Sequence, residues 1–521
     1  MTSGIVGAHT IGRWLHDSAL AAPARIAIDD RGVRTDYRTL ADRVDALARR
    51  LTDAGYGAGQ RIATVSGNSA DHIVAFFACA QLGIAFVPLS WRLTPAELAD
   101  LITRTAPALL LVEDEHAALT TAALELAEAA PSRVALGVAG VEADAPAAVD
   151  AVAARPAHDD DPLLIIYTSG SEAAPKGVVL THENCFWNNL ALDRAMPLDA
   201  DDVVLAMLPQ YHVAAWNVQP LQAWWRGATV VLERGFDPGR VLQLITARGV
   251  TAMMGVPTQY RMLQRHPLWS CADLSSLTRI VAGGATIPED LAALWGERGL
   301  AFTQGYGLTE AGPNVLFLAP ELAAEHPGAV GRPYPGVDVC LVDPDTGLEL
   351  EGAATGELWV RGASVFAGYL DDPEATARAR HGEWLRTGDL LQRDAQGIHR
   401  VVDRLKEIYV SGGENVAPAA VERALAAHPL VVACAVVGVA DETWGERGFA
   451  FVVTSGAVSA DELRAFAAER LASFKLPARI EFIDRLPRST IDKVARSTLR
   501  RMAQDLMAAQ PAQKETHDRA H

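Results

Sequence analysis

Cysteine is scarce in this sequence. The 521 residues include five cysteines, which lie far apart and form no CxxC pair: Cys79, Cys185, Cys271, Cys340 and Cys434. Disulfide-stabilised secreted proteins and cysteine-ligated metal sites both need cysteines at characteristic spacings. We therefore expect buried, reduced cysteines in a cytoplasmic protein, with no metal cluster.

Positive charge is also in deficit. Lysine and arginine number 46 against 64 aspartates and glutamates, which gives a formal net charge of −18. Nucleic acids and anionic membranes attract proteins with a basic surface. The negative net charge argues against a nucleic acid or an anionic membrane as the main partner. A local basic cleft is still compatible with this net charge.

No apolar run is long enough to cross a bilayer. The most hydrophobic stretch, 73–89, is interrupted by Gln81, Gly83 and Pro88. A membrane-spanning helix needs about 20 apolar residues. The N-terminus also lacks a basic segment followed by an apolar one, so no signal peptide is predicted. We expect a buried helix followed by a strand here and no integral membrane segment; peripheral membrane association stays open.

Short apolar runs alternate with helical periodicity over most of the chain. Strands are predicted at 25–28, 60–65, 85–88, 109–112, 163–166, 178–180, 203–207, 228–232, 252–255 and 280–282. Tyr37 to Asp53 has helical spacing, and Thr94 begins another helix with Pro95 at its first position and Glu97 completing a capping box. Buried strands separated by helices predict an α/β fold with largely parallel sheets.

The pattern changes after about residue 337. Strands at 337–342, 356–360 and 397–402 with intervening turns predict a more antiparallel, β-rich subdomain. The following segment predicts a small α+β domain with helices at 417–427 and 460–472 and strands at 431–439 and 448–454. We therefore expect a large domain over 1–403, a small domain over 404–506, and a disordered tail over 507–521.

The stretch Tyr167–Gly177 joins two predicted strands through hydroxyl residues, glycine and Lys176. Such a hairpin tip can wrap an anion, because glycine lets backbone N–H groups converge and lysine adds positive charge. It lacks the Walker A spacing, since no Gly-Lys-Ser/Thr begins a helix. A plain turn explains the same residues.

Four further stretches contain residues that could bind a ligand. They are Gly283-Gly284-Ala285 at the end of a strand, 305–310 with an aromatic, a hydroxyl and a carboxylate, Arg386–Leu390 with a turn aspartate, and 403–407 followed by 411–415. The carboxyl end of a strand is where α/β proteins usually bind ligands. Each stretch taken alone is also compatible with an ordinary turn.

Taken together, these motifs resemble those of the adenylate-forming superfamily of acyl-CoA synthetases, nonribosomal-peptide adenylation domains and beetle luciferases. The resemblance runs from about residue 25 to 500 and rests on motifs in the family's order: Tyr167–Gly177, Tyr306–Glu310, Thr387–Leu390, Arg404, Ser411–Val416 and Leu486–Lys493. It implies that ATP activates a carboxylic acid to an acyl-adenylate with release of pyrophosphate. A thiol then displaces AMP.

The resemblance also implies roles for individual residues. Lys493 would bridge the carboxylate and the α-phosphate, Tyr306 would stack on adenine, Thr309 would touch the α-phosphate, and Asp389 would accept the ribose hydroxyls beside Arg404. Mg²⁺ would be held by Thr168 and Glu310. The remaining nucleotide contacts would come from the phosphate loop and the strand-end glycines: Thr168, Ser169, Gly170, Ser171, Lys176, Gly283, Gly284 and Ala285.

A second set of implied roles concerns the acid and the thiol. His212 matches the family's gate between the acyl pocket and the thiol tunnel, for which a core histidine is the alternative. Lys406 falls on the hinge about which the small domain swings, bringing in Lys493 for one step and Ser411, Gly412 and Gly413 for CoA. The acyl pocket would be lined by Trp216, Asn217, Gly307 and Gly312.

Two departures from the family pattern bear on phosphate handling. Glu172 and Ala173 stand where the family usually has threonine and glycine, and Asp492 stands where glycine is common. A carboxylate near triphosphate is unfavourable, so Glu172 must point outward, meet a cation or mark altered phosphate handling.

The expected function is an ATP-, Mg²⁺- and CoA-dependent ligase for an aliphatic or aryl acid. The alternatives are transfer to a carrier-protein thiol or another nucleophile, adenylation of an oxyanion such as nitrite, and a non-catalytic nucleotide-binding protein. A homodimer is left open.

Overall fold

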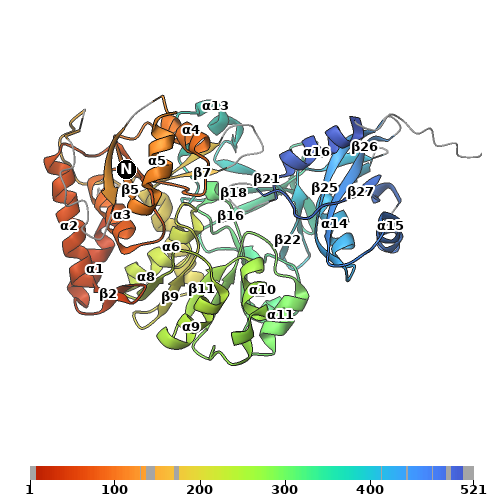
Figure 1. Ribbon diagram of the computed structural model, residues 1–521, viewed down its shortest axis with the longest axis horizontal. Helices are drawn as coiled ribbons and strands as arrows, with labels where there is room; N and C mark the ends of the chain where they lie inside the picture. Colours follow the sequence, from red (N-terminus) through yellow and green to blue (C-terminus); the bar gives the residue numbers. More distant parts are fainter. Residues whose placement is uncertain are drawn as a thin grey trace, which may run out of the picture.

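The computed structural model describes residues 8–128, 131–136, 147–148, 150–168, 175–405, 407–411, 414–441, 444–471, 473–488 and 494–508. Figure 1 shows a large body built on three sheets and a small body, in blue at the right, that holds the last sheet and the last helices. The predicted α/β class, with a large N-terminal and a small C-terminal domain, is confirmed.

The first sheet is mainly parallel and has nine strands among the described residues. Their spatial order is β15 (Arg332–Pro333), β14 (Leu316–Leu318), β13 (Phe302–Tyr306), β12 (Arg279–Ala282), β11 (Ala252–Gly255), β9 (Val203–Ala206), β10 (Thr229–Leu232), β1 (Ile26–Asp30) and β2 (Val33–Asp36). The strands predicted at 203–207, 228–232, 252–255 and 280–282 are its centre, and they pair in parallel as expected.

The second sheet contains the predicted phosphate-loop hairpin. Its order is β19 (Gly368–Tyr369), β8 (Lys176–Thr181), β7 (Pro162–Thr168), β4 (Ala85–Leu89), β3 (Arg61–Val65), β5 (Leu109–Glu113) and β6 (Ser132–Leu136). Strands β3, β4, β5 and β6 are parallel, whereas β7 and β8 form the antiparallel hairpin and β19 continues it. The hairpin prediction is confirmed.

Helices cover both faces of these two sheets. The central layer is formed by α1 (Trp14–Ala21), α2 (Tyr37–Asp53), α3 (Ala70–Leu82), α6 (His182–Ala195), α7 (Ala214–Asn217) and α8 (Pro220–Arg226), and the outer faces carry α4 (Pro95–Thr105), α5 (Ala117–Leu124), α9 (Pro238–Arg248), α10 (Pro257–Arg265) and α11 (Glu289–Gly296). Successive strand residues point to opposite faces. In β10, accordingly, Val230 packs in the central core and Val231 in the outer one.

The third sheet is the antiparallel subdomain that the sequence predicts after residue 337. It contains β17 (Glu349–Leu350), β16 (Asp338–Val342), β18 (Ala354–Arg361), β21 (Trp384–Arg393) and β20 (Arg380–His381), and β22 (His399–Arg404) pairs with β21. Two short helices, α12 (Pro320–Ala323) and α13 (Pro373–Arg378), lie in its connections.

The small domain is a sheet with helices on both faces. Its strands are β24 (Glu414–Val416), β23 (Tyr409–Ser411), β26 (Gly445–Thr454), β25 (Val431–Asp441) and β27 (Arg479–Phe482), and its helices are α14 (Pro418–Ala426), α15 (Ala460–Ala468) and α16 (Arg496–Ala508). Val436 packs with α14 and α15, whereas Val437 packs with α16.

The sequence predictions hold for most of these elements. Helix α2 has the predicted bounds, and α4 begins with the predicted capping box at Thr94. The predicted helix 460–472 is too long, since α15 ends at Ala468. Of the predicted disordered tail, residues 507 and 508 belong to α16, and 509–521 lie outside the described residues.

The cysteines are free, but the expectation that all are buried is wrong. Cys271 is exposed directly after the 3₁₀ helix Pro267–Ser270, where its thiol donates to the carbonyl of Leu268. Within the described ranges, every helix is too short or too polar to span a bilayer.

His72 and Gln210 position the segment that leads to His212. His72 is fully buried in α3, with its Nδ1 2.8 Å from Gln210 Oε1 and its Nε2 2.8 Å from Thr64 Oγ1. Trp216 Nε1 donates to the carbonyl of Gln210 at 2.6 Å. Burial lowers the pKa of His72 to about 4, so the ring is neutral at physiological pH.

This burial predicts a pH-dependent stability. Between pH 6.5, the ordinary pKa of histidine, and about 4, unfolding takes up a proton at His72. The contribution is complete above pH 6.5 and is lost as the pH falls toward 4. His72→Gln should flatten the pH dependence of the unfolding free energy by up to about 1.4 kcal/mol per pH unit, measured by urea denaturation from pH 4.5 to 7.5. An unchanged slope in a folded variant would contradict it.

Candidate active site

Residues from two separate motifs contact the carboxylate of Asp389, which belongs to a third motif. Tyr306 at the end of β13 donates its hydroxyl to Asp389 Oδ2 at 2.7 Å, and Arg404 Nε lies 3.1 Å from Asp389 Oδ1. Asp389 and Arg404 are direct partners in the β21–β22 ladder. Burial and the Asp389 carboxylate hold the pKa of Tyr306 well above its usual value, so the hydroxyl stays a donor. The same carboxylate raises the pKa of Arg404.

The turn that presents Asp389 is held by a residue that the sequence analysis missed. Glu357 in β18 is buried and accepts from the backbone N–H of Gly388 at 3.1 Å and from Trp359 Nε1 at 2.8 Å. Gly388 has φ +69°, a conformation that favours glycine. The side chain of Thr387 donates to the carbonyl of Leu358 and accepts from the N–H of Asp389. Glu357 lies in a strand of alternating polar and apolar residues, and no sequence motif indicates its role.

The segment Gly283–Ala285 lies directly after β12, beside β13. The buried Gln304 holds it, since its Nε2 lies 3.2 Å from the carbonyl of Ala282 and 3.1 Å from that of Ala285, while its Oε1 accepts from the N–H of Ile287. A Cβ on Gly283 would stand 2.8 Å from Met254 Cε. A side chain at position 283 would therefore collide with Met254. Gln304, which holds this loop, is a second residue without a sequence signal.

A cation, a phenol and a carboxylate line up beside the hairpin. Lys176 Nζ lies 5.2 Å from the ring centroid of Tyr369, and Tyr369 donates its hydroxyl to Glu310 Oε1 at 2.8 Å. Thr168 and Lys176 face each other at the tip of the β7–β8 ladder. Tyr369 comes from β19, which pairs with β8. The structure thus brings Thr168, Lys176 and Glu310 to one edge, through a tyrosine that the sequence analysis did not single out.

The loop after Tyr306 packs too tightly to accept larger residues. A Cβ on Gly307 would stand 1.4 Å from the carbonyl oxygen of Pro313, and Gly312 has φ +104°. Thr309 and Glu310 lie in a short 3₁₀ helix, Thr309–Ala311.

A network of buried asparagines anchors this loop. Asn217 Nδ2 donates to the carbonyl of Gly312 at 2.7 Å, and its Oδ1 accepts from Asn189 at 3.2 Å. Asn188 and Asn314 both donate to the backbone carbonyl of Asn217. Asn217 therefore acts as a connection between α7 and the loop, and a role in the acyl pocket stays a prediction.

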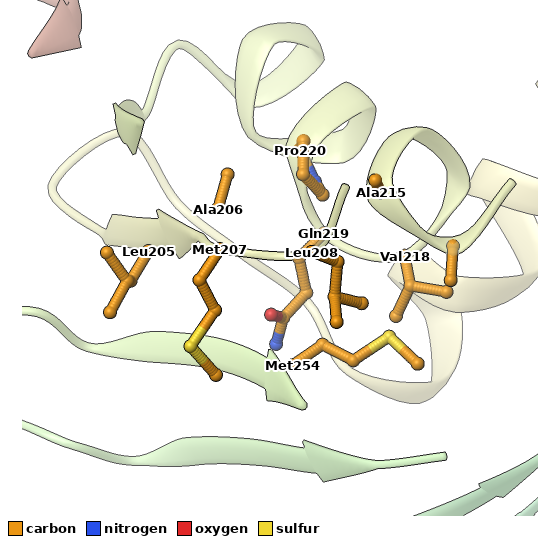
Figure 2. A pocket seen from close by; sticks show the side chains of 10 residues that line it. Leu205, Ala206, Met207, Leu208, Ala215, Val218, Gln219, Pro220 and Met254 are labelled. Atoms are coloured by element: carbon orange, nitrogen blue, oxygen red, sulfur yellow. The ribbon is translucent and has the colours of Figure 1, made fainter. Parts of the chain in front are cut away.

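An apolar cavity lies beside α7, with Met254, Val218 and Leu208 around it (Figure 2). The predicted gate His212 lies in the turn just before α7, with its ring against that of Tyr211. Trp216 is fully buried below, stacked on Phe76 with 4.4 Å between ring centroids. Neither Trp216 nor Asn217 is among the residues that line this cavity, so the small alanines of α7, not its tryptophan, face it.

Seven predicted site residues lie outside the described residues: Ser169, Gly170, Ser171, Lys406, Gly412, Gly413 and Lys493. Glu172, Ala173 and Asp492, the three departures from the family pattern, lie outside them too. Ser411 is described, and is buried in β23 opposite Glu414.

An ion-pair cluster connects the chain that follows the predicted hinge with the start of α16. Arg496 Nε lies 2.7 Å from Glu407 Oε2, and Arg496 Nη1 lies 2.8 Å from Glu422 Oε1. Burial raises the pKa of Glu407, although Arg496 opposes the rise. The first residue of α16 is thereby tied to the chain that follows Lys406.

Comparison with known proteins agrees with this geometry. The family model described as AMP-binding enzyme matches residues 15–370, and the model described as AMP-binding enzyme C-terminal domain matches residues 420–493. The feruloyl-CoA synthase of Amycolatopsis sp is 41% identical over 479 residues, covering 92% of this chain and 96% of that protein. The indoleacetate–CoA ligase of Aromatoleum aromaticum is 35% identical over 492 residues, covering 92% and 96%.

Solved structures give the same result. The o-succinylbenzoate CoA synthetase from Bacillus subtilis, in complex with its acyl-adenylate intermediate, superposes with a TM-score of 0.84 at 28% identity, covering 94% of this chain and 97% of that one. The resemblance inferred from the motifs is therefore confirmed over nearly the whole length. The chain belongs to the AMP-binding enzymes of the adenylate-forming superfamily, and it is an AMP-forming acid–thiol ligase of the acyl-CoA synthetase type.

Proposed function

We propose that the protein uses ATP and Mg²⁺ to convert an aryl carboxylic acid to its acyl-adenylate, and then transfers the acyl group to CoA. The observation that carries the proposal is the contact of Tyr306, Asp389 and Arg404, which come from three sequence motifs. The strand that ends at Tyr306 lies beside the strand that leads to Gly283–Ala285. A flat ring, an acceptor carboxylate and a cation are the groups that a nucleoside and its phosphate need.

The nucleotide would lie along the edge formed by β12, β13 and β21. Adenine would stack between Tyr306 and the backbone of Gly283, Gly284 and Ala285. The ribose hydroxyls would donate to Asp389, whose two oxygens are held by Tyr306 and Arg404. Because those two donors already orient the carboxylate, it needs no rearrangement when the ribose arrives.

The phosphates would extend toward the hairpin. Lys176 and the hydroxyls of Thr168, Ser169 and Ser171 would surround the β- and γ-phosphates together with Gly170, and Thr309 would contact the α-phosphate. Glu310 fits a Mg²⁺ role because Tyr369 donates to its Oε1 and, among the described residues, no hydrogen bond uses its Oε2. A hard cation prefers such oxygen ligands. Mg²⁺ would neutralise charge on the triphosphate.

The first chemical step must bring two anions together. A carboxylate and an α-phosphate about 4 Å apart repel by roughly 4 kcal/mol at an effective dielectric constant of 20. Lys493, three residues before the anchored Arg496, would supply the compensating charge at the meeting point. The carboxylate oxygen would then attack the α-phosphorus, and the bond to the bridging oxygen would break to release pyrophosphate.

The second step would require the small domain, residues 404–506, to turn about Lys406 relative to the large domain, residues 1–403. Lys493 would leave and the segment Ser411, Gly412 and Gly413 would approach for the thiol, which attacks the acyl carbon while AMP departs. His212 would gate the thiol tunnel. Glu407 and Arg496, which form an ion pair within the small domain, would move together in this rotation.

Aryl acids are proposed because the cavity beside α7 is apolar and because the two relatives named above act on feruloyl and indoleacetate groups. The pocket residues named from the resemblance, Trp216, Asn217, Gly307 and Gly312, would shape its walls indirectly. Transfer to a carrier-protein thiol or another nucleophile, a homodimer and a cytoplasmic location stay predictions.

AMP release against a panel of acids tests the function. The wild-type protein should release AMP with aryl acids, and CoA should convert the adenylate to a thioester detected by mass spectrometry. Lys493→Ala should slow acid-dependent pyrophosphate exchange about 10²- to 10³-fold, since it removes preorganised charge. AMP release independent of CoA would favour another acceptor, and full exchange in Lys493→Ala would overturn the mechanism.

Tyr306→Phe tests the nucleoside site. Loss of the hydroxyl that donates to Asp389 should raise the KM for ATP roughly tenfold and change the KM for the acid little. Tyr37→Phe is the matched control, because Tyr37 is also buried and donates at 2.7 Å to a backbone carbonyl, that of Ala228, far along the chain. An unchanged KM for ATP in Tyr306→Phe would contradict the placement.

Lys406→Pro tests the hinge. Proline fixes φ and so restricts rotation at this position, and thioester formation should fall about tenfold or more while adenylate formation stays within about twofold. Lys406→Ala removes the same side chain without restricting the backbone and should leave both steps near wild type. Equal rates in the proline and alanine variants would exclude rotation at Lys406.

A further inference from the structure

Gln219 has an unusual backbone for a buried residue. It precedes α8 with φ +77° and ψ −51°, and its exposed fraction is 3%. Among the described residues, the other non-glycine residues with positive φ are Arg31, Ala106 and Asp371, and all three are exposed. Strain at buried positions is concentrated at functional sites. The conformation places the side chain of Gln219 in the apolar cavity beside α7.

The orientation of the Gln219 amide is determined by one neighbour. Its Nε2 lies 3.4 Å from the backbone carbonyl of Arg279. A carbonyl can only accept, so the amide nitrogen must face it and the oxygen must face the other way. That oxygen, Oε1, is buried and has no hydrogen-bond partner within the part of the chain that the structure describes. Gln219 therefore offers one buried acceptor to the cavity, while one of its two amide N–H groups donates to the carbonyl of Arg279.

The cavity around this acceptor is otherwise apolar. Leu205, Met207, Val218 and Met254 line it together with Gln219, and Figure 2 shows the amide among these side chains. Met254 also stands beside Gly283, since its Cε lies 2.8 Å from where a Cβ on that glycine would be. Met254 thus separates the proposed adenine loop from Gln219, and an acyl group that starts at the nucleotide would meet Met254 before Gln219.

The volume of the cavity, about 10 Å³, holds no more than a water-sized group. Met207 and Met254 are unbranched and have three rotatable bonds, so they can rearrange around a flat ring with little cost. The acceptor of Gln219 cannot rearrange as easily, because its backbone and its Nε2 are both held. A ring that displaces the methionines would therefore bring its far edge to a fixed acceptor.

We propose that Gln219 is a specificity-determining residue whose side-chain carbonyl accepts a hydrogen bond from an O–H or N–H group on the far edge of an aromatic acid. The proposal rests on the proposed function and adds the polar group of the substrate to it. An acid whose far edge carries only carbon would leave the buried oxygen unpaired, and an acid that carries only an acceptor there would face it unfavourably.

Matched pairs of acids test this proposal. One pair is 4-hydroxycinnamate and 4-methoxycinnamate, and the other is indole-3-acetate and its N-methyl derivative. Each second member carries a methyl group in place of the donor hydrogen, so the comparison with Gln219→Met separates loss of the donor from the added bulk. Wild-type kcat/KM for adenylation should favour the donor-bearing member of at least one pair about 10- to 100-fold. The pair that shows the preference distinguishes O–H from N–H recognition.

Gln219→Met should reduce this preference to about twofold or less. Methionine has a similar length and no branch at Cβ, so the backbone cost of the positive φ is the same in both proteins. Gln222→Met is the control, because Gln222 is equally buried in α8 but donates its amide to the carbonyl of Met196 and does not line the cavity. The control should keep the wild-type preference.

The outcomes distinguish a failure of the proposed function from a failure of the role of Gln219. No AMP release from any acid would overturn the proposed function, and the role of Gln219 with it. AMP release without preference in either pair, or a preference that persists in Gln219→Met, would overturn the role of Gln219 alone. Where Gln219→Met does not fold, the lack of a preference in the wild-type protein would still overturn the role of Gln219.

Discussion

The carboxylate of Asp389, held between the hydroxyl of Tyr306 and the guanidinium of Arg404, is the interaction on which the site depends. It connects the end of a parallel strand to two strands of the antiparallel subdomain, and Arg404 is the last residue of β22 before the predicted hinge. The Arg404 side chain is 57% exposed, so solvent screens the pair and its contribution to stability is small. Its importance is geometric, because one acceptor with two fixed donors orients everything that binds beside it.

Buried polar side chains, rather than apolar packing, position the loops of this site. Glu357 holds the Asp389 turn, Gln304 holds the loop after β12, and Asn217 holds the loop after Tyr306. Loops leave backbone groups without the partners that strands provide, and a buried unpaired group is costly. These carboxylate and carboxamide side chains supply the missing partners, and in doing so they give each loop one conformation.

The apolar cavity beside α7, which we propose as the acyl site, is built in the opposite way. Its walls are leucine, valine and methionine, and the single strained polar residue is Gln219. A nucleoside is the same in every turnover and suits a preorganised polar site, whereas acids differ among relatives and suit an adaptable apolar one. The two halves meet at Gly283, where the absence of a side chain lets Met254 lie close to the nucleotide loop.

The sequence by itself determined what depends on neighbours along the chain. The bounds of α2, the capping box at Thr94 and the β7–β8 hairpin follow from periodicity and local hydrogen bonds, and the order of the motifs was enough to identify the family. Only the tertiary structure showed that Tyr369 meets Glu310 and that Trp216 is buried in the core. Such contacts join residues far apart in the chain, and no local pattern records which of them a fold brings together.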